Sequence, residues 1–264
     1  MSAAPPIPVR SPLPGSLSGA TAVLIGASSG IGLAAGALLR SVGARVVLVG
    51  RDPDRLKAAV SRVRSASRAD APDDAVMGVP GDGADEQTLA EVFDRAGPVD
   101  HVLVTAGGIS GAGPVAGLSA DAVRATFDSR LGAAFAAARA AATRLPAGGS
   151  LTFSSGILVV RPAPGMTAPL AVTGAVETLT RALAVELAPA RVRVNTVRFG
   201  RIDTPLLRSL PGLDSDEAIA AAGSTAPLGR FGTAEEAAAT ALFLMANNYV
   251  TGQIITVDGG EVLT

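Results

Sequence analysis

The chain has 264 residues, of which 48% are hydrophobic and 17% are charged, so it can fill the core of a large globular domain and is not expected to be disordered. The formal net charge is −1 and no basic run stands out, which argues against nucleic acid or an anionic membrane surface as the main partner. The absence of cysteine excludes disulfides, thiol catalysis and thiolate metal sites. The single histidine, His101, has no carboxylate cluster nearby, so we expect no metal site.

Residues 1–18 are rich in proline and small residues, and we interpret them as a flexible arm. They lack the basic start and long apolar run of a signal peptide. No charge-free apolar stretch of transmembrane length occurs elsewhere. We therefore expect no membrane segment and a cytoplasmic location.

From residue 20 onward, short apolar runs alternate with helical stretches. A helix is expected from the glycine-rich loop to residue 41, and others at 53–64, 86–95, 120–143, 170–187 and 234–245. Strands are expected at 21–25, 44–49, 75–79, 99–105, 150–154, 191–197 and 254–257. This alternation predicts an α/β fold, a single-domain Rossmann fold over residues 19–264 with a doubly wound parallel sheet flanked by helices.

A glycine-rich loop, GASSGIG at 26–32, connects the first expected strand to the first helix. In that position backbone N–H groups at the helix N-terminus face the pyrophosphate of a dinucleotide. The strand–loop–helix context makes this pattern more specific than glycine spacing alone. It predicts the following cofactor-binding residues: Gly26, Ser28, Ser29, Gly30, Ile31 and Gly32.

The residue after the second strand selects the cofactor. An acid there would bind the ribose 2′-hydroxyl, but this chain has Arg51, which suits a 2′-phosphate. Ser28 can add a hydroxyl contact. We therefore expect NADP(H) in preference to NAD(H), the alternative for Arg51 being a solvated charge at a helix start.

Further motifs follow in order: GDG at 81–83, VTAG at 104–107, RVNTV at 193–197, GRIDTP at 200–205, YVTGQ at 249–253 and VDGG at 257–260. With the glycine-rich loop, they make the chain resemble the short-chain dehydrogenase/reductase family over nearly its whole length. The resemblance implies that Asp82 and Gly83 lie at the adenine, and that Ala106 and Gly107 pass close to the cofactor. It also implies that Thr204 belongs to the segment holding the nicotinamide carboxamide, and that the protein forms a homodimer or homotetramer.

The catalytic positions depart from that family, whose chemistry uses a Tyr-x-x-x-Lys pair. The resemblance aligns Pro169 with the tyrosine and Thr173 with the lysine, and it places Ser129 at the position of the usual asparagine. Ser155 fits the catalytic serine and is the one member that remains.

Other residues can be considered as substitutes for the missing pair. We expect Tyr249 to be structural, and Lys57 and His101 to lie at the surface. Arginine stays charged and is a poor proton donor, but it can stabilise an oxyanion. Four arginines are placed for that role, although each alone is more often a structural or surface charge: Arg130, Arg161, Arg198 and Arg201.

A positioned general acid contributes ~10²–10⁴-fold in rate, so its loss handicaps ordinary ketone reduction without forbidding hydride transfer. We therefore expect an atypical NADP(H)-dependent oxidoreductase that reduces a specialised carbonyl, quinone or imine without the tyrosine; an iminium needs no proton when it accepts hydride. The alternatives are a redox-inactive cofactor-binding pseudoenzyme and a non-redox lyase or cyclase. A leucine-rich lid at 205–228 predicts an apolar or aromatic small-molecule substrate.

Overall fold

A seven-stranded parallel sheet forms the centre of the computed structural model, which describes residues 11–66, 75–108 and 110–264. The strand order is β3-β2-β1-β4-β5-β6-β9, and every neighbouring pair runs parallel. The strands are β1 (Thr21–Ile25), β2 (Arg45–Gly50), β3 (Val76–Pro80), β4 (His101–Val104), β5 (Ser150–Gly156), β6 (Arg193–Phe199) and β9 (Ile254–Val257). The doubly wound fold predicted from the sequence is confirmed.

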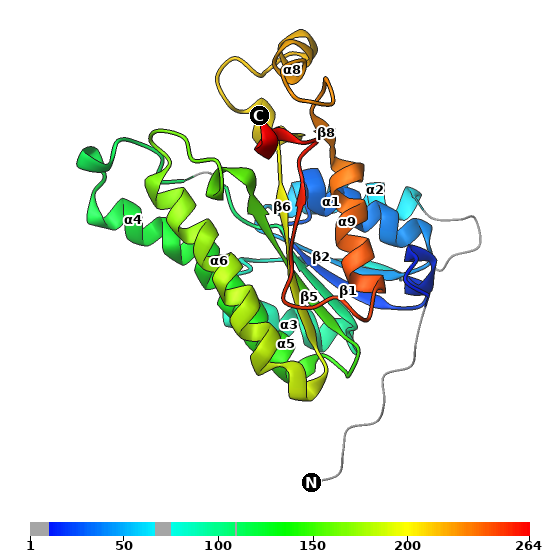
Figure 1. The fold of residues 1–264 in the computed structure, drawn as a ribbon. Helices are drawn as coiled ribbons and strands as arrows, with labels where there is room; N and C mark the ends of the chain where they lie inside the picture. Colours follow the sequence, from blue (N-terminus) through cyan, green and yellow to red (C-terminus); the bar gives the residue numbers. More distant parts are fainter. Residues whose placement is uncertain (1–10, 67–74, 109) are drawn as a thin grey trace.

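Helices cover both faces of this sheet (Figure 1). One face carries α1 (Gly30–Ser41), α2 (Pro53–Ser65) and α9 (Ala234–Ala246). The other carries α3 (Glu86–Ala96), α5 (Ala133–Arg144) and α6 (Thr167–Glu186). Because successive strand residues point to opposite faces, Val23 and Ile25 of β1 join one core cluster while Ala22 and Leu24 join the other.

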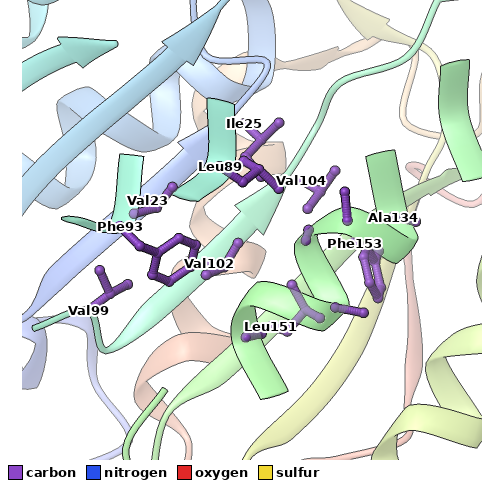
Figure 2. Packing of buried hydrophobic residues seen from close by; sticks show 14 of the residues in the cluster. Val23, Ile25, Leu89, Phe93, Val99, Val102, Val104, Ala134, Leu151 and Phe153 are labelled. Atoms are coloured by element: carbon purple, nitrogen blue, oxygen red, sulfur yellow. The ribbon is translucent and has the colours of Figure 1, made fainter. Parts of the chain in front are cut away.

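Figure 2 shows the first of these clusters, in which Val23 and Val102 of neighbouring strands pack under Phe93 of α3. Farther along the sheet, Phe153 of β5 lies against Ala134 of α5. The small side chains of α5 let this helix approach the sheet closely.

Shorter elements lie mainly at the carboxyl edge of the sheet. They are α4 (Ala120–Phe127), α7 (Pro205–Arg208), α8 (Asp216–Gly223), and a two-stranded ribbon of β7 (Ile202–Asp203) and β8 (Gly232–Thr233). Short 3₁₀ turns span Pro14–Leu17, Val115–Gly117, Ile157–Val159, Ala188–Ala190 and Glu261–Leu263. In the described parts of the chain no helix has the length and apolarity needed to cross a membrane.

Three expectations are corrected by the structure. The helix expected at 120–143 is interrupted by a π-helical turn at Asp128–Gly132. The arm expected at 1–18 ends earlier, because Leu17 is buried against the core; residues 1–10 lie outside the described part. His101, expected at the surface, is 3% exposed and shares a hydrogen bond of 2.9 Å with Ser150, since it begins an internal strand.

Candidate functional site

The strand order reverses between β1 and β4, where doubly wound proteins bind their ligands. The loops that follow these two strands touch each other. A Cβ added at Gly26 would lie 2.5 Å from the Ala106 nitrogen, and one at Gly32 would lie 2.6 Å from Thr105 Oγ1. Only glycine fits at these two positions, so the predicted glycine-rich loop and the segment at 105–107 form one continuous surface.

The N-terminus of α1 faces this surface without a capping side chain. Ser29 is its N-cap residue and makes no side-chain cap, whereas Asp52, Asp85 and Thr233 cap α2, α3 and α9. The free N–H groups of α1 can therefore bind phosphate oxygens. Residues far apart in the sequence meet here, because a Cβ at Gly30 would lie 3.5 Å from Thr204 Cγ2. These residues fit a dinucleotide cofactor.

Cationic and hydroxyl groups gather where the resemblance places the adenosine end of that cofactor. Ser28 packs against Gly50, whose added Cβ would lie 3.3 Å from Ser28 Cβ, and Arg51 follows with an exposed side chain. The sequence analysis missed Arg55, which donates to Ser29 Oγ over 3.3 Å. Its signal was its position four residues after Arg51, in the first turn of α2.

Asp82 and Gly83 lie after β3, beside the same loop. Asp82 accepts a hydrogen bond of 3.0 Å from the Ala84 N–H, and its side chain is exposed. Gly83 packs so tightly on β1 that an added Cβ would meet Ile25 Cγ2. Ile31 contacts the core below the loop. The cofactor roles of all these residues stay predictions.

The two positions aligned with the missing tyrosine and lysine are buried in the first turns of α6. Pro169 has no donor or acceptor in its side chain. The Thr173 hydroxyl donates to the Pro169 carbonyl over 2.7 Å and accepts from Arg130 Nη1 over 3.1 Å. This part of α6 therefore presents no proton donor able to replace the tyrosine.

Ser155 is 5% exposed, and its hydroxyl donates to Glu177 Oε1 over 2.5 Å. Glu177 lies two helical turns beyond Pro169, about 12 Å along the helix axis. It also accepts two hydrogen bonds from Arg198, of 2.9 and 2.6 Å. The catalytic role of Ser155 stays a prediction, and the geometry gives its hydroxyl a structural partner.

Glu177 was missed by the sequence analysis, although its spacing of four from Thr173 marked it as an acid on the buried face of α6. Burial raises the pKa of Glu177, but the hydrogen bonds from Arg198 and Ser155 outweigh burial and hold that pKa below its usual value. A buried carboxylate of this kind remains charged because its partners replace water.

Three of the four arginines considered as oxyanion stabilisers have partners. Arg198 pairs with Glu177, and Arg201 pairs with Glu261 over 3.0 Å while stacking on Phe231. Arg161 donates to the backbone carbonyl of Glu261. The contacts of Arg201 and Arg161 join the segments after β6 and β5 to the C-terminal segment, which lies at the top of Figure 1, whereas that of Arg198 joins β6 to α6.

Arg130 differs from the other three. It lies in the π-helical turn with its guanidinium against Gly107, where an added Cβ would be 3.0 Å from Arg130 Nε. No carboxylate of the described residues pairs with it, and burial alone lowers its pKa. The neighbouring Ser129, assigned to the asparagine position, is exposed and bonds the Thr126 carbonyl over 3.1 Å. The residue of this turn that reaches the site is Arg130.

Tyr249 and Lys57 are both exposed, and Tyr249 is 99% exposed. His101 begins β4, at the opposite end of that strand from Gly107. In the described ranges, no group of three or more histidine, aspartate or glutamate side chains is placed to hold a metal ion.

The lid expected at 205–228 contains α7 and α8. Arg208 connects them by pairing with Asp203 over 2.6 Å and with Asp216 over 2.8 Å. Leu207 is buried, whereas Leu206 and Leu228 are exposed. Its function as a lid stays a prediction.

Comparison with known proteins gives three consistent findings. Residues 26–261 match the family model described as "Enoyl-(Acyl carrier protein) reductase". The chain is 33% identical to "Carbonyl reductase family member 4" of Danio rerio, over 90% of this chain and 96% of that protein. It is 31% identical to "Short-chain dehydrogenase/reductase ATR9" of Stachybotrys chlorohalonatus, over 94% of this chain and 98% of that protein.

Among solved structures, the chain is similar to the MalC reductase/Diels-Alderase of Malbranchea aurantiaca. The TM-score is 0.85 and the sequence identity is 27%, with 94% of this chain and 98% of that chain covered. The likeness therefore extends over the whole sheet and its helices.

Proposed function

The chain belongs to the short-chain dehydrogenase/reductase family, and on that premise we propose that it is an NADP(H)-dependent reductase that works without the usual tyrosine acid. The observation that carries the proposal is a cofactor cradle, formed by the glycine-rich loop and the segment at 105–107, beside a site in which neither Pro169 nor Thr173 is a general acid able to replace the tyrosine. The α1 N-terminus is uncapped, and glycine is required at Gly26 and Gly32. The cofactor supplies the hydride, and the protein supplies binding and alignment.

The preference for NADP(H) is supported by the charges beside the glycine-rich loop. Arg51 and Arg55 flank Ser28 and Ser29, and no acid stands at the end of β2. A 2′-phosphate placed there would be bound by two guanidinium groups. The substrate that we propose is a specialised carbonyl, quinone or imine. We also propose homo-oligomeric assembly and a cytoplasmic location.

Titration of the purified protein with NADPH and NADH, followed by fluorescence, tests the cofactor. We expect NADPH to bind more tightly than NADH, and Arg51→Asp to weaken NADPH binding by at least tenfold by replacing attraction with repulsion. The matched control is Arg62→Asp, an exposed arginine farther along α2, which should bind NADPH as the unmodified protein does. Failure to bind either nucleotide would remove the reductase proposal.

A second candidate is a non-redox cyclase. It is favoured by the similarity to a protein named reductase/Diels-Alderase, and it agrees with the lack of a general acid at Pro169 and Thr173. In that case NADPH binding would be retained without NADPH oxidation by any acceptor. The redox-inactive pseudoenzyme gives the same result and additionally shows no turnover of a cyclisable substrate.

A further inference from the structure

Arg130 has the surroundings expected of a residue that binds an anionic ligand. Within the described ranges it has no acidic partner, while Arg198 and Arg201 each have a glutamate. The residue is partly buried, so its charge has lost some of its water. An unpaired cation held in such a position is costly unless a group of opposite charge completes it.

The position of the guanidinium places that charge at the reaction site. Arg130 Nη1 lies 3.1 Å from Thr173 Oγ1, on α6 at the position aligned with the missing lysine. Its Nε faces Gly107, whose loop continues from the cofactor cradle through Ala106. The π-helical turn adds a residue to the helix at this point, and such turns often occur at functional sites.

Resting on the proposed reductase function, we propose that Arg130 is a catalytic residue that stabilises an oxyanion. We further propose that the substrate is a quinone or another conjugated carbonyl compound, in preference to an iminium ion. The inference depends on where Arg130 lies: a fixed cation, with no acidic partner among the described residues, stands beside positions that hold no general acid. This arrangement suits a reaction whose immediate product is a weakly basic anion.

The balance of the step shows why no acid is needed. The conjugated carbon of the acceptor receives a hydride with both electrons of the broken C–H bond, and NADPH is oxidised to NADP⁺. The π electrons of the acceptor shift onto the carbonyl oxygen, which becomes an enolate; in a quinone this enolate then becomes the aromatic hydroquinone anion when the ring carbon returns a proton to water and the second oxygen takes one up. The enolate oxygen pairs with the Arg130 guanidinium and takes its proton from water after release. An ordinary ketone would give a strongly basic alkoxide and would still need the missing tyrosine.

An iminium ion carries the opposite charge. It arrives as a cation beside the positive guanidinium, so the same residue that stabilises an oxyanion opposes its binding. Arg130 therefore separates two of the substrate classes that the sequence leaves open.

Two bicyclic probes of similar shape test the charge preference: a naphthoquinone and an N-methyl dihydroisoquinolinium ion, each assayed by NADPH oxidation. We expect the higher kcat/KM with the naphthoquinone. Arg130→Gln should lower kcat with the naphthoquinone by about 10²–10³-fold, the usual effect of removing one oxyanion-stabilising group. With the iminium ion, the same variant should turn over at an unchanged or higher rate. Arg124→Gln, an exposed arginine of α4, is the matched control.

A binding measurement gives a readout that does not depend on turnover. With NADP⁺ present, para-nitrophenol bound to the protein should ionise at a lower pH than in water, as followed by absorbance, because the guanidinium stabilises its phenolate. The shift should disappear in Arg130→Gln and remain in Arg124→Gln. Absence of nitrophenol binding, or the same shift in Arg130→Gln, would overturn the inference.

NADPH titration of each variant separates failure of this inference from failure of the proposed function. We expect Arg130→Gln to bind NADPH within about threefold of the unmodified affinity, since the change tested is in catalysis. Loss of NADPH binding in Arg130→Gln would make Arg130 a cofactor ligand, and a higher kcat/KM of the unmodified protein with the iminium ion than with the naphthoquinone would reverse the substrate class. Either result overturns the inference and leaves the reductase proposal standing, whereas absence of NADPH binding in the unmodified protein removes both.

Discussion

Two helical glycines, one in the cradle and one in α6, differ in whether they tolerate a side chain. A Cβ at Gly32 in α1 would lie 2.6 Å from Thr105 Oγ1 and 2.8 Å from the Gly26 carbonyl oxygen. A Cβ at Gly174 in α6 would meet nothing closer than Val159 Cγ1, at 3.8 Å. The first glycine is required by packing, and the second is not.

Replacing glycine by alanine is therefore expected to change the free energy of unfolding in opposite directions at the two positions. Gly32→Ala should lower the free energy of unfolding by about 1–3 kcal/mol through overpacking and should weaken NADPH binding, because the loops after β1 and β4 move apart. Gly174→Ala should raise the free energy of unfolding by up to about 1 kcal/mol, since alanine favours helix. Urea unfolding of both variants checks the signs, and a Gly32→Ala protein of unchanged stability would contradict the close contact.

Residue types alone indicated the glycine-rich loop but not which arginine reaches the proposed site. The motif at 26–32 and Thr204 were identified from the sequence, and the structure brings Gly30 and Thr204 together. The resemblance placed Ser129 at the asparagine position, and Arg130 was considered only as one of four arginines that could stabilise an oxyanion. The π-helical turn directs Arg130 inward instead, which adjacent positions in an ideal helix would not reveal.

A buried ion pair and a hydrogen bond, both to Glu177, connect the three elements β5, α6 and β6. Glu177 of α6 receives hydrogen bonds from Ser155 of β5 and from Arg198 of β6, and both members of the ion pair have little exposed side chain. This connection fixes the helix that carries Pro169 and Thr173 against the sheet. Removing one partner leaves the other charge buried and unpaired, which typically costs about 3–5 kcal/mol.

The pH dependence of Glu177→Gln follows from the pKa of Glu177, which is lower in the folded than in the unfolded protein. The stabilisation is fully present above the ordinary value of 4.5 and is lost as the pH falls through the folded value. Glu177→Gln should therefore be much less stable than the unmodified protein at pH 7, and the difference should narrow in acid below the ordinary value.

Urea unfolding at several pH values measures that difference. Glu91→Gln, which breaks the exposed pair with Arg95, is the control and should change the free energy of unfolding by less than about 1 kcal/mol. A destabilisation of Glu177→Gln that stayed constant through the acid range would show that its cause is packing and not charge.

At the scale of the whole molecule, the parallel sheet places every loop of the site at one edge. A ligand that binds across the loops after β1 and β4 stabilises the folded chain as a unit, by about 2.7 kcal/mol at a hundredfold excess over its Kd. We expect NADPH to raise Tm by several degrees and NADH to raise it less at the same concentration. Equal shifts would contradict the preference for the 2′-phosphate, and Arg51→Asp should remove about half or more of the NADPH shift.

The sequence by itself determined the doubly wound fold and the position of the glycine-rich loop, because both depend on local patterns; the cofactor role of that loop stays a prediction. Buried parallel strands are short apolar runs, and a glycine-rich loop between strand and helix needs no distant partner to be identified. The sequence also determined that the usual acid and lysine are missing, since one tyrosine and one lysine lie far from the required spacing.

Only the tertiary structure decided which arginine is available to a ligand. Arg198, Arg201 and Arg161 are bound by Glu177 and Glu261, whose positions are set by the packing of α6 and the C-terminal segment. Arg130 reaches Thr173 because a π-helical turn changes the direction of its side chain. Ion pairs between distant residues and a single extra residue in a helical turn leave no periodic signal, so three-dimensional packing was needed to distinguish these four equal charges.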